Sequence, residues 1–440
     1  MRIAVLINLS PRKLGSLEGW LVALCEESRR RGYAVDVYGR DPIHPEVLAS
    51  LQALGVGWRT VDWLEASPLR AVRRLAAYDV IHLNMFQPRT QVAMLAYAAW
   101  PARVLMVDHS SGPVPATERN ELVSGVLRRA ADRFSMVRVD HLAGVSNYVR
   151  DRDQRRFELP AHRVRTIYNG VDVKRFAPRR EASSPPERTS MVAVAYLIPQ
   201  KGVETLLYAM ARMRWSRTPL TMVGDGPEAG RLKALAIRLG ISSRVHFAGV
   251  RDDIPQLIDE ADIFVHPALW AEAFGLSIAE AMATERAVVA SRIGGIPELV
   301  QHGESGLLVE PGNAAELAEA LDSLVAHPHE RLRLARNARQ RVIERFELRG
   351  CVDAHLGWME EAMALPPPVP RHDHNTLVVP EVPRPPRIAA KPARGTNAVV
   401  SISRRPLFGP TARLEPQATA EPRSSERPEL AQEPVAPQAR

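Results

Sequence analysis

The chain has 440 residues, more than one ordinary domain holds, which predicts two domains and an appendage. The formal net charge is +8, but the basic residues are scattered and no aromatic-plus-basic motif accompanies them, which argues against a nucleic-acid-binding protein. Cys25 and Cys351 lie far apart and lack metal-ligand spacing, which argues against a disulfide framework or a structural zinc site and fits a reducing cytoplasm.

The N-terminal sequence MRIAVLINLS has an apolar run shorter than a signal-peptide core, and no small-residue cleavage site follows it. We interpret it as a first β-strand. The most apolar stretch, residues 92–107, is interrupted by Pro101 and Arg103, so it is shorter than the roughly 20 residues that span a bilayer. We therefore expect no transmembrane segment.

Short apolar runs alternate with longer amphipathic stretches along the chain, a pattern typical of parallel α/β architecture. The first series of predicted strands is RIAVLIN, YAVDVYG, DVIHLN, RVLMVDH and HLAGVS. The second series is SMVAVAYL, PLTMVGD, RVHFAGV, DIFVHPA, AVVAS and GLLVE. A polar stretch with two prolines, RREASSPPERTS at 179–190, separates the two series and is typical of an interdomain linker. We therefore predict two sheets.

Two other segments carry composition signals. Residues 366–440 hold 16 of the 36 prolines with few aromatic residues, so we expect a disordered tail whose role is open. The segment GVLRRAADRFSMVRVD at 125–140 interleaves arginines with apolar residues. It fits an ordinary solvated helix face, and it also fits peripheral contact with an anionic membrane at the inner face.

The stretch AEAFGLSIAEAMA places Glu272 and Glu280 eight positions apart, around a predicted helix start. In one interpretation, Ser277 and Glu280 form a capping box and Glu280 does no chemistry. In the other, the free amides of the helix start and Gly275 seat a diphosphate, while a carboxylate accepts hydrogen bonds from ribose hydroxyls. The spacing alone does not decide between the two.

Further glycine-rich turns follow other strands of the second series. Lys201 lies near a turn glycine in YLIPQKG, Gly224 opens the turn in MVGDGPE, and Gly294 follows a strand in ASRIGGIPELV. Ligands of open α/β sheets bind at the carboxyl ends of the strands, where these turns converge. Backbone amides and one lysine suit a phosphate group.

With these motifs in order, the chain resembles a family-4 retaining glycosyltransferase of the GT-B fold, from Met1 to about Met363. The resemblance rests on NLSPRKLGSLEGWL, DVIHLN, VDHSSG, GVSNYVRD and TIYNGVDVKRF in the first half. In the second half it rests on LIPQKGVETLLYA, VGDGPE, VHFAGV and the long run FVHPALWAEAFGLSIAEAMATERAVVASRIGGIPELVQHGESGLLVEPGN.

The resemblance implies two Rossmann-like domains with parallel sheets that face a central cleft. The implied boundaries are an acceptor-side domain at 1–178, the linker at 179–190, a donor-nucleotide domain at 191–345, a helix crossing back at 346–365, and the tail at 366–440.

The resemblance also implies roles for individual residues. Glu280 would hold the ribose hydroxyls of a UDP- or GDP-sugar donor, and Glu272 would lie beside the transferred sugar. Lys201 would pair with the phosphates, and His109 would lie near the sugar and the acceptor. The remaining implied donor contacts are Gly15, Ser16, Gly224, Val250, Phe274, Gly275 and Leu276.

Two positions depart from the family pattern. Tyr196 stands where the family commonly has an arginine that shares the phosphates with the lysine, and Ser16 stands in a turn that commonly has two glycines. With Lys201 and helix amides on the phosphates, we expect no metal and no cofactor. The DxD-like sequence at 150–153 lies in a charged helical stretch, and we do not assign a metal to it.

We therefore predict a cytoplasmic, metal-independent hexosyltransferase that transfers a sugar with retention to a lipid, glycan or small-molecule acceptor. Front-face attack is the expected route, and a covalent route through Glu272 is the alternative. Two other hypotheses stay open: a GT-B sugar-nucleotide epimerase, and a non-catalytic sugar-nucleotide-binding protein in which the missing arginine is the first sign of decay.

Overall fold

The computed structural model describes residues 1–11, 15–61, 74–86, 99–112, 130, 132–180 and 185–366. In the arginine-rich segment at 125–140 that carries the membrane hypothesis, residues 125–129 and 131 lie outside the described residues. The disorder predicted for the tail likewise concerns residues outside the description, apart from Pro366.

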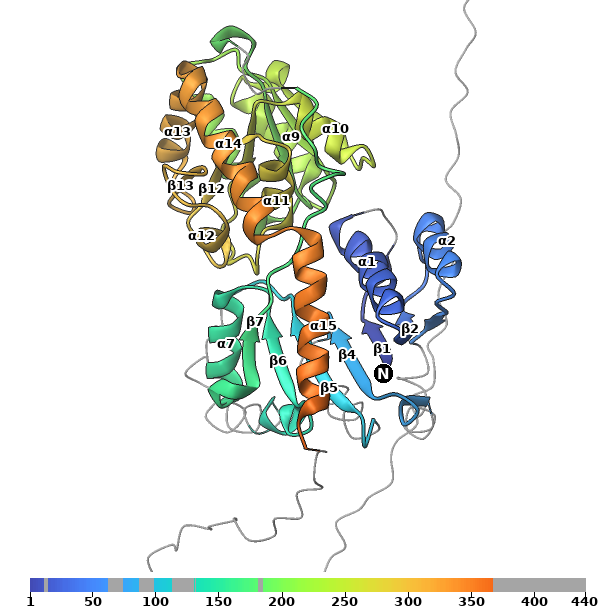
Figure 1. Ribbon diagram of the computed structural model, residues 1–440. Coiled ribbons are helices and arrows are strands. Elements are labelled where there is room, and N and C mark those ends of the chain that lie inside the picture. The colour runs from blue at the N-terminus through green and yellow to red at the C-terminus, as the bar shows by residue number, and fades with distance from the viewer. Residues whose placement is uncertain are drawn as a thin grey trace, which may run out of the picture. The chain divides into compact units, whose positions relative to one another are not determined.

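The first half of the chain forms a seven-stranded parallel sheet in the order β3-β2-β1-β4-β5-β6-β7 (Figure 1). Its strands are buried apolar runs that alternate with amphipathic helices, as in β1, whose last five residues are all buried. The elements are β1 (Arg2–Ile7), α1 (Ser16–Arg30), β2 (Ala34–Gly39), α2 (Pro45–Ala53), β3 (Trp58–Thr60), β4 (Val80–Asn84), β5 (Arg103–Asp108), β6 (His141–Gly144), α7 (Asn147–Phe157) and β7 (Val164–Thr166).

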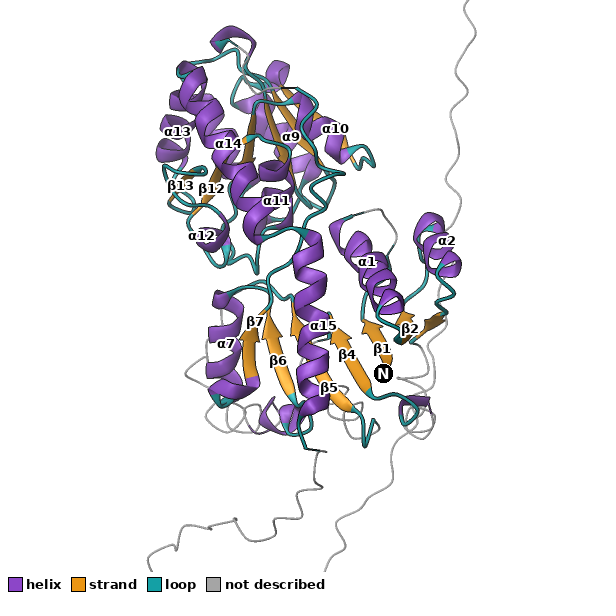
Figure 2. Ribbon diagram, viewed as in Figure 1, coloured by secondary structure: helices purple, strands orange, loops and turns teal. Residues whose placement is uncertain are grey.

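The second half forms a six-stranded parallel sheet in the order β10-β9-β8-β11-β12-β13, flanked by helices (Figure 2). Its strands and the helices between them are β8 (Met191–Val194), α8 (Val203–Arg212), β9 (Leu220–Val223), α9 (Ala229–Arg238), β10 (Val245–Gly249), α10 (Ile254–Glu260), β11 (Ile263–His266), α11 (Leu276–Ala283), β12 (Ala287–Ser291), α12 (Ile296–Leu299) and β13 (Leu307–Val309). Three helices follow, α13 (Ala314–Ala326), α14 (Pro328–Arg345) and α15 (Leu348–Ala364).

Helix α15 packs against elements of the first sheet rather than the second. It contacts α1 and β5, and its carboxylates bind Arg31, at the C-terminal end of α1. The guanidinium of Arg31 lies 2.5 Å from Asp353 Oδ1 and 3.0 Å from Glu360 Oε1. These contacts agree with the expected return crossing of the last helix, while the exact domain boundaries stay predictions.

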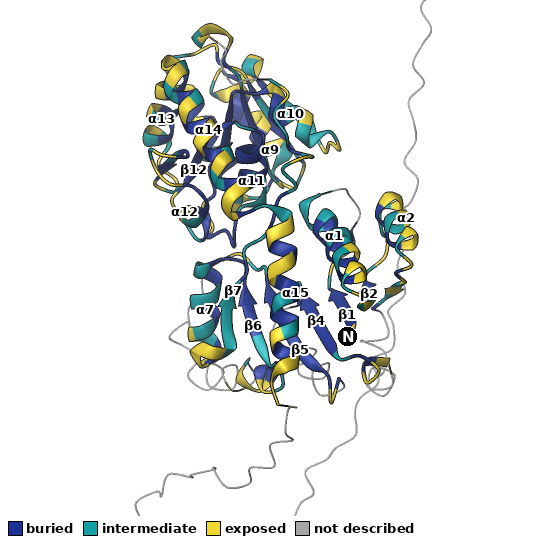
Figure 3. Ribbon diagram, in the orientation of Figure 1, coloured by how far each residue is buried: buried dark blue, intermediate teal, exposed yellow. Residues whose placement is uncertain are grey.

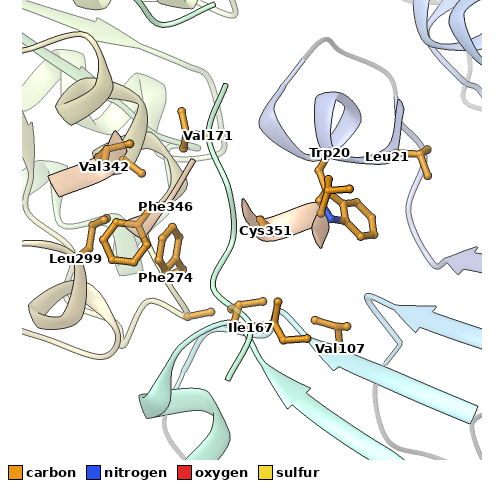
Figure 4. Close-up of a cluster of buried hydrophobic side chains, with 14 of the residues drawn as sticks. Trp20, Leu21, Val107, Ile167, Val171, Phe274, Leu299, Val342, Phe346 and Cys351 are labelled. Atoms are coloured by element: carbon orange, nitrogen blue, oxygen red, sulfur yellow. The ribbon is translucent and has the colours of Figure 1, made fainter. Parts of the chain in front are cut away.

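The strands of both sheets consist largely of buried residues, drawn dark blue in Figure 3, and most of these residues are apolar. One cluster extends from Trp20 and Val107 to Phe274 and Phe346, as the close-up shows (Figure 4). The rings of Phe274 and Phe346 lie 5.5 Å apart at 66°, an edge-to-face geometry that aromatic pairs favour. This packing fixes the loop that carries Glu272 against the start of α15.

Every strand predicted from sequence is present, and the fold class is two Rossmann-like domains. Two three-residue edge strands, β3 and β7, were missed because WRT and VRT have no apolar run. Among the described residues, no helix combines the length and the apolar character that a membrane crossing requires.

Candidate functional site

A cavity of about 830 Å³ lies at the carboxyl ends of strands from both sheets. The first sheet contributes the start of α1 and the residue after β4. The second contributes the ends of β8, β9 and β11, the loop after β10, and the start of α11. The lining residues with predicted roles are Gly15, Ser16, Tyr196, Lys201, Gly224, Val250, Leu276 and Glu280.

Helix α11 begins at Leu276 and presents its first turn to this cavity. Its N-cap is Gly275, whose φ of 100° lies in the left-handed region that favours glycine. Among the described residues, no side-chain hydrogen bond caps the start of the helix. The capping-box interpretation of Ser277 and Glu280 is therefore wrong, because the N-cap is Gly275, two residues before the Ser277 that the Ser-x-x-Glu pattern indicates.

Glu280 instead bonds across the cavity. Its Oε1 accepts a hydrogen bond of 2.6 Å from the Ser16 hydroxyl, which belongs to the first residue of α1. The side chain is 9% exposed, so this carboxylate is at the cavity wall rather than in bulk solvent. The serine that departs from the family pattern thus contacts the residue predicted to hold the ribose.

Lys201 and Glu272 form an ion pair, with 2.5 Å between Nζ and Oε1. A tight turn aims the lysine, because Gly202 has a φ of 65° and a Cβ there would lie 1.9 Å from the Pro267 carbonyl oxygen. His266 Nε2 lies 3.4 Å from the same carboxylate oxygen, and Ser111 Oγ donates to Glu272 Oε2 at 3.3 Å.

These contacts decide the protonation state of Glu272. Burial raises its pKa, but the hydrogen bond and charge of His266 and the charge of Lys201 outweigh burial and lower the pKa to about 2. Glu272 is therefore an ionised carboxylate at neutral pH. It can stabilise positive charge or accept hydrogen bonds, and it cannot act as a proton donor.

Tyr196 and Val250 project into the cavity as exposed apolar side chains, with exposed fractions of 62% and 77%. The basic residues of the cavity wall are Lys201, Arg175 and Arg251. Of these, Arg251 is paired with Asp253 at 2.6 Å. Position 196 is a tyrosine rather than an arginine. This part of the wall therefore presents the ammonium group of Lys201 and the aromatic ring of Tyr196.

The loop that carries His109 is anchored by a buried arginine. Arg152 of α7 lies 2.8 Å from Asp108 Oδ2 and 2.9 Å from Asp153 Oδ1, and donates to the Ser110 carbonyl oxygen at 2.7 Å. Asp153, part of the DxD-like sequence, is thus bound to a neighbouring arginine. In the part of the chain that the structure describes, no group of three or more His, Cys, Asp or Glu is placed to hold a metal ion.

His109 follows β5 and lies beside Asn84, with 3.4 Å between its Nε2 and Asn84 Oδ1. Burial lowers the pKa of His109 to about 4, which outweighs the opposing charge of Asp108. The imidazole is therefore neutral at physiological pH. It is not among the residues that line the cavity, although Met85, next to its partner Asn84, lines it.

The structure therefore brings together eight of the predicted positions and leaves four outside the cavity wall: His109, Glu272, Phe274 and Gly275. Phe274 as a whole is 2% exposed, so it is buried and does not reach the cavity wall. Sequence reasoning missed His266 and Ser111, which hold Glu272. The position of His266 at the end of the predicted strand DIFVHPA could have indicated that it lies at the site. No local sequence pattern indicated that Ser111 contacts Glu272.

Comparison with known proteins identifies two matching family models. The model described as Glycosyltransferase Family 4 matches residues 17–175, and the model described as Glycosyl transferases group 1 matches residues 175–341. A D-inositol 3-phosphate glycosyltransferase of Saccharomonospora viridis is 27% identical over 410 residues, covering 82% of this chain and 94% of the relative.

A GDP-mannose-dependent alpha-(1-6)-phosphatidylinositol monomannoside mannosyltransferase of Mycobacterium tuberculosis is 31% identical over 274 residues, covering 58% of this chain and 69% of the relative. Among solved structures, Anabaena Alr3699/HepE in complex with UDP superposes with a TM-score of 0.67 at 23% identity. That match covers 82% of this chain and all of the Anabaena chain, and it supports the fold.

Proposed function

The chain belongs to glycosyltransferase family 4, and on this footing we propose that it transfers a sugar from a nucleoside diphosphate sugar to a hydroxyl of a lipid, glycan or small-molecule acceptor, with retention of configuration. The observation that carries the proposal is the cavity in which Lys201, the first turn of α11 and Glu280 converge. A cation, free helix amides and a carboxylate match the diphosphate and ribose of such a donor.

The chemical step breaks the bond between the anomeric carbon and a phosphate oxygen. Negative charge then develops on the nucleoside diphosphate, and donors fixed in place stabilise it, each by on the order of 3 kcal/mol. We assign this role to Lys201 and the amides of α11, which supply the positive charge without a metal ion.

The acceptor oxygen attacks the same face that the phosphate leaves, and the departing phosphate oxygen takes the acceptor proton. The contacts of Glu272 favour this route over a covalent one. Its carboxylate already accepts from Lys201 and Ser111 and lies against His266, so little electron density is available for attack on carbon. Glu272 instead offers a fixed negative charge next to the sugar, which forms a cationic transition state.

The names of the relatives and of the structural neighbour suggest which donors and acceptors to test first. The Anabaena neighbour is bound to UDP and the Mycobacterium relative is GDP-mannose-dependent, so we propose a UDP- or GDP-sugar. Both relatives described above act on an inositol derivative by name, which makes a polyol hydroxyl a reasonable first acceptor to test.

The test is a thermal-shift panel of UDP- and GDP-sugars followed by a donor-hydrolysis assay. A donor at a hundred times its dissociation constant should add about 2.7 kcal/mol to the free energy of unfolding. The same donor should be hydrolysed slowly to free sugar and nucleoside diphosphate, with equal rates with and without EDTA.

Other outcomes separate the alternatives. Stabilisation without any hydrolysis or transfer would favour the non-catalytic binding protein. Conversion of the donor to a second sugar or to its epimer without an acceptor would favour the epimerase. A rate that EDTA abolishes and a divalent cation restores would contradict metal independence.

A further inference from the structure

A chain of polar side chains connects the interior of the first sheet with His109. His82 and Asn84 lie on β4 with fully buried side chains. The Asn84 side-chain nitrogen lies 2.8 Å from His82 Nδ1, and its oxygen lies 3.4 Å from His109 Nε2. A single amide therefore contacts one ring nitrogen of each histidine.

The orientation of this amide follows from its third contact. Asn84 Nδ2 also lies 3.5 Å from the His82 carbonyl oxygen, which can only accept a hydrogen bond. A flipped amide would place two oxygens against each other at this point. The nitrogen therefore faces His82, and the oxygen faces His109.

This orientation determines which nitrogen of each ring carries a proton. Because Asn84 Nδ2 donates, His82 Nδ1 is the acceptor and the proton of this neutral ring is on Nε2. Because Asn84 Oδ1 can only accept, the proton of His109 is on Nε2. The Nδ1 atom of His109 then carries a lone pair.

Packing holds the inner end of the chain in place. The His82 ring lies 5.1 Å from the His355 ring of α15, 6.0 Å from Trp20 and 6.1 Å from Trp358, measured between centroids. No described residue bonds to His82 Nε2. His82 therefore keeps its orientation through ring packing, and its only polar side-chain contact among the described residues is Asn84.

The outer end of the chain reaches the candidate site. Asn84 is the last residue of β4, and the next residue, Met85, lines the cavity with a left-handed φ of 61°. The carboxylate next to His109, that of Asp108, is already bound to Arg152 and the Ser110 amide. Among the described residues, Asn84 is the one whose side chain hydrogen-bonds the His109 ring, so it sets the direction of that ring.

We propose that Asn84 is a positioning residue that holds His109 in its Nε2–H form, so that His109 acts through Nδ1 as a hydrogen-bond acceptor for a hydroxyl of the bound sugar or acceptor. The assignment of that hydroxyl rests on the proposed glycosyl transfer. The protonation pattern of the ring does not, because it follows from contacts within the ligand-free protein.

The direct test is NMR of the full chain with ¹⁵N-labelled histidine at pH 7. Long-range ¹H–¹⁵N correlations report which nitrogen of each neutral imidazole carries the proton, and the spectrum of His109→Gln assigns His109 among the 13 histidines. The parent protein should show His109 protonated on Nε2, and Asn84→Leu should show a mixture of the two forms. A proton on Nδ1 in the parent, or an unchanged pattern in Asn84→Leu, would overturn the proposal.

Asn84→Asp keeps the test decisive if the leucine variant fails to fold. The aspartate retains an oxygen opposite His109 Nε2, so the Nε2–H form should persist, and the added negative charge should raise the pKa of His109. Loss of the Nε2–H signal in this variant would overturn the proposal equally.

The kinetic arm separates positioning from general destabilisation. Asn84→Leu should lower kcat by roughly ten- to a hundredfold with an unchanged dissociation constant for the donor, because misplacement of the ring affects the reacting geometry. Asn313→Ala, which removes an asparagine cap from α13 and is not among the residues that line the cavity, should leave kcat unchanged. An equal loss in both variants would mean a structural role only. Absence of activity in the parent would refute the proposed function and leave the protonation result intact.

Discussion

The carboxyl ends of the two sheets have the same architecture but differ in charge: the histidines of the first are neutral, and the Lys201–Glu272 pair of the second is charged. In the first sheet, burial lowers the pKa of His109 at the carboxyl edge to about 4 and that of His82 in the interior to about 3, so both rings are neutral. At the edge of the second sheet, Lys201 and Glu272 are both charged and lie 2.5 Å apart. Desolvation decides the protonation state on one side, and ion pairing decides it on the other.

Under the proposed function, this difference would assign the donor and acceptor halves of the reaction to different sheets. A nucleoside diphosphate needs fixed charge and free amides, which the second sheet supplies at Lys201 and α11. In the same proposal, sugar and acceptor hydroxyls would meet a neutral hydrogen-bonding group of the first sheet, His109. The glycine turns and buried strands are common to both sheets, so the side chains at the strand ends make the distinction.

The largest expected effect is on kcat, and it comes from removing the positive charge of Lys201 at the edge of the second sheet. Lys201→Ala should lower kcat by roughly a hundred- to a thousandfold, because the charge that the lysine meets is greatest in the transition state. Lys233→Ala is the matched control, since that lysine lies on the exposed face of α9. If Lys201→Ala turns over donor at the parental rate, the diphosphate is bound elsewhere.

The next effect concerns donor affinity. Glu280→Gln should weaken donor binding by roughly ten- to a hundredfold, because a hydrogen bond to a charged group is worth about 1.5–3 kcal/mol. The melting temperature should hardly change, because Glu280 does not cap α11 and glutamine still accepts from Ser16. Calorimetric titration and a thermal melt measure both quantities.

Ser16→Ala is the partner control for this prediction. It removes the Ser16 contact with Glu280 while leaving the carboxylate, so donor affinity should change much less than in Glu280→Gln. Early melting of Glu280→Gln with normal donor binding would assign the carboxylate to stability rather than to the ribose.

The buried histidines of the first half and Glu272 of the second should lower the free energy of unfolding in different pH ranges. Histidine has a pKa of 6.5 when unperturbed, and the folded-state pKa values of His82 and His355 are lowered by burial. Below pH 6.5 the unfolded chain binds protons that the folded chain does not, so each buried histidine lowers the free energy of unfolding by up to about 1.4 kcal/mol per pH unit. For Glu272, the equivalent window runs from pH 4.5 down to about 2.

Urea unfolding midpoints at several pH values test this contrast. His355→Phe should flatten the decline in stability between pH 6.5 and 4.5 relative to the parent, whereas Glu272→Gln should flatten it only below pH 4.5. Parallel curves for the parent and His355→Phe above pH 4.5 would show that the histidine is not buried in its neutral form.

The smallest effect is expected for substitutions of Tyr196, the residue that stands where the family commonly has an arginine. Tyr196→Arg should tighten binding of the free nucleoside diphosphate by a few-fold, because a guanidinium can bond two phosphate oxygens at once. Tyr196→Phe should bind like the parent. Calorimetry of UDP and GDP with the three proteins measures the difference, and weaker binding to Tyr196→Arg would place the phosphates away from the end of β8.

The sequence predicted the fold well because parallel strands buried on both faces are continuous apolar runs, as in RVLMVDH and AVVAS. It also predicted that Lys201 and Glu280 would share one site, because strand ends of a parallel sheet meet at one edge. It did not decide whether Glu280 was a cap, since that depended on the φ of the preceding glycine, Gly275.

Contacts between distant parts of the chain were beyond sequence reasoning. The bond from Ser16 to Glu280 and the bond from Ser111 to Glu272 each join the two halves of the chain, and no local pattern marks them. The protonation states at both edges follow from burial and neighbours of this kind. His82, which resembled an ordinary core histidine in DVIHLN, contacts Asn84 two residues further along the same strand.

The measurement that tests the central claim most directly is a crystal structure of the protein with UDP or GDP bound. The account predicts that the diphosphate lies between the Lys201 ammonium and the first amides of α11, with the ribose hydroxyls on Glu280. It also predicts that His109 remains outside the diphosphate contacts. A nucleotide bound outside this cavity, or one whose diphosphate contacts neither Lys201 nor α11, would contradict the division between a charged donor edge and a neutral acceptor edge.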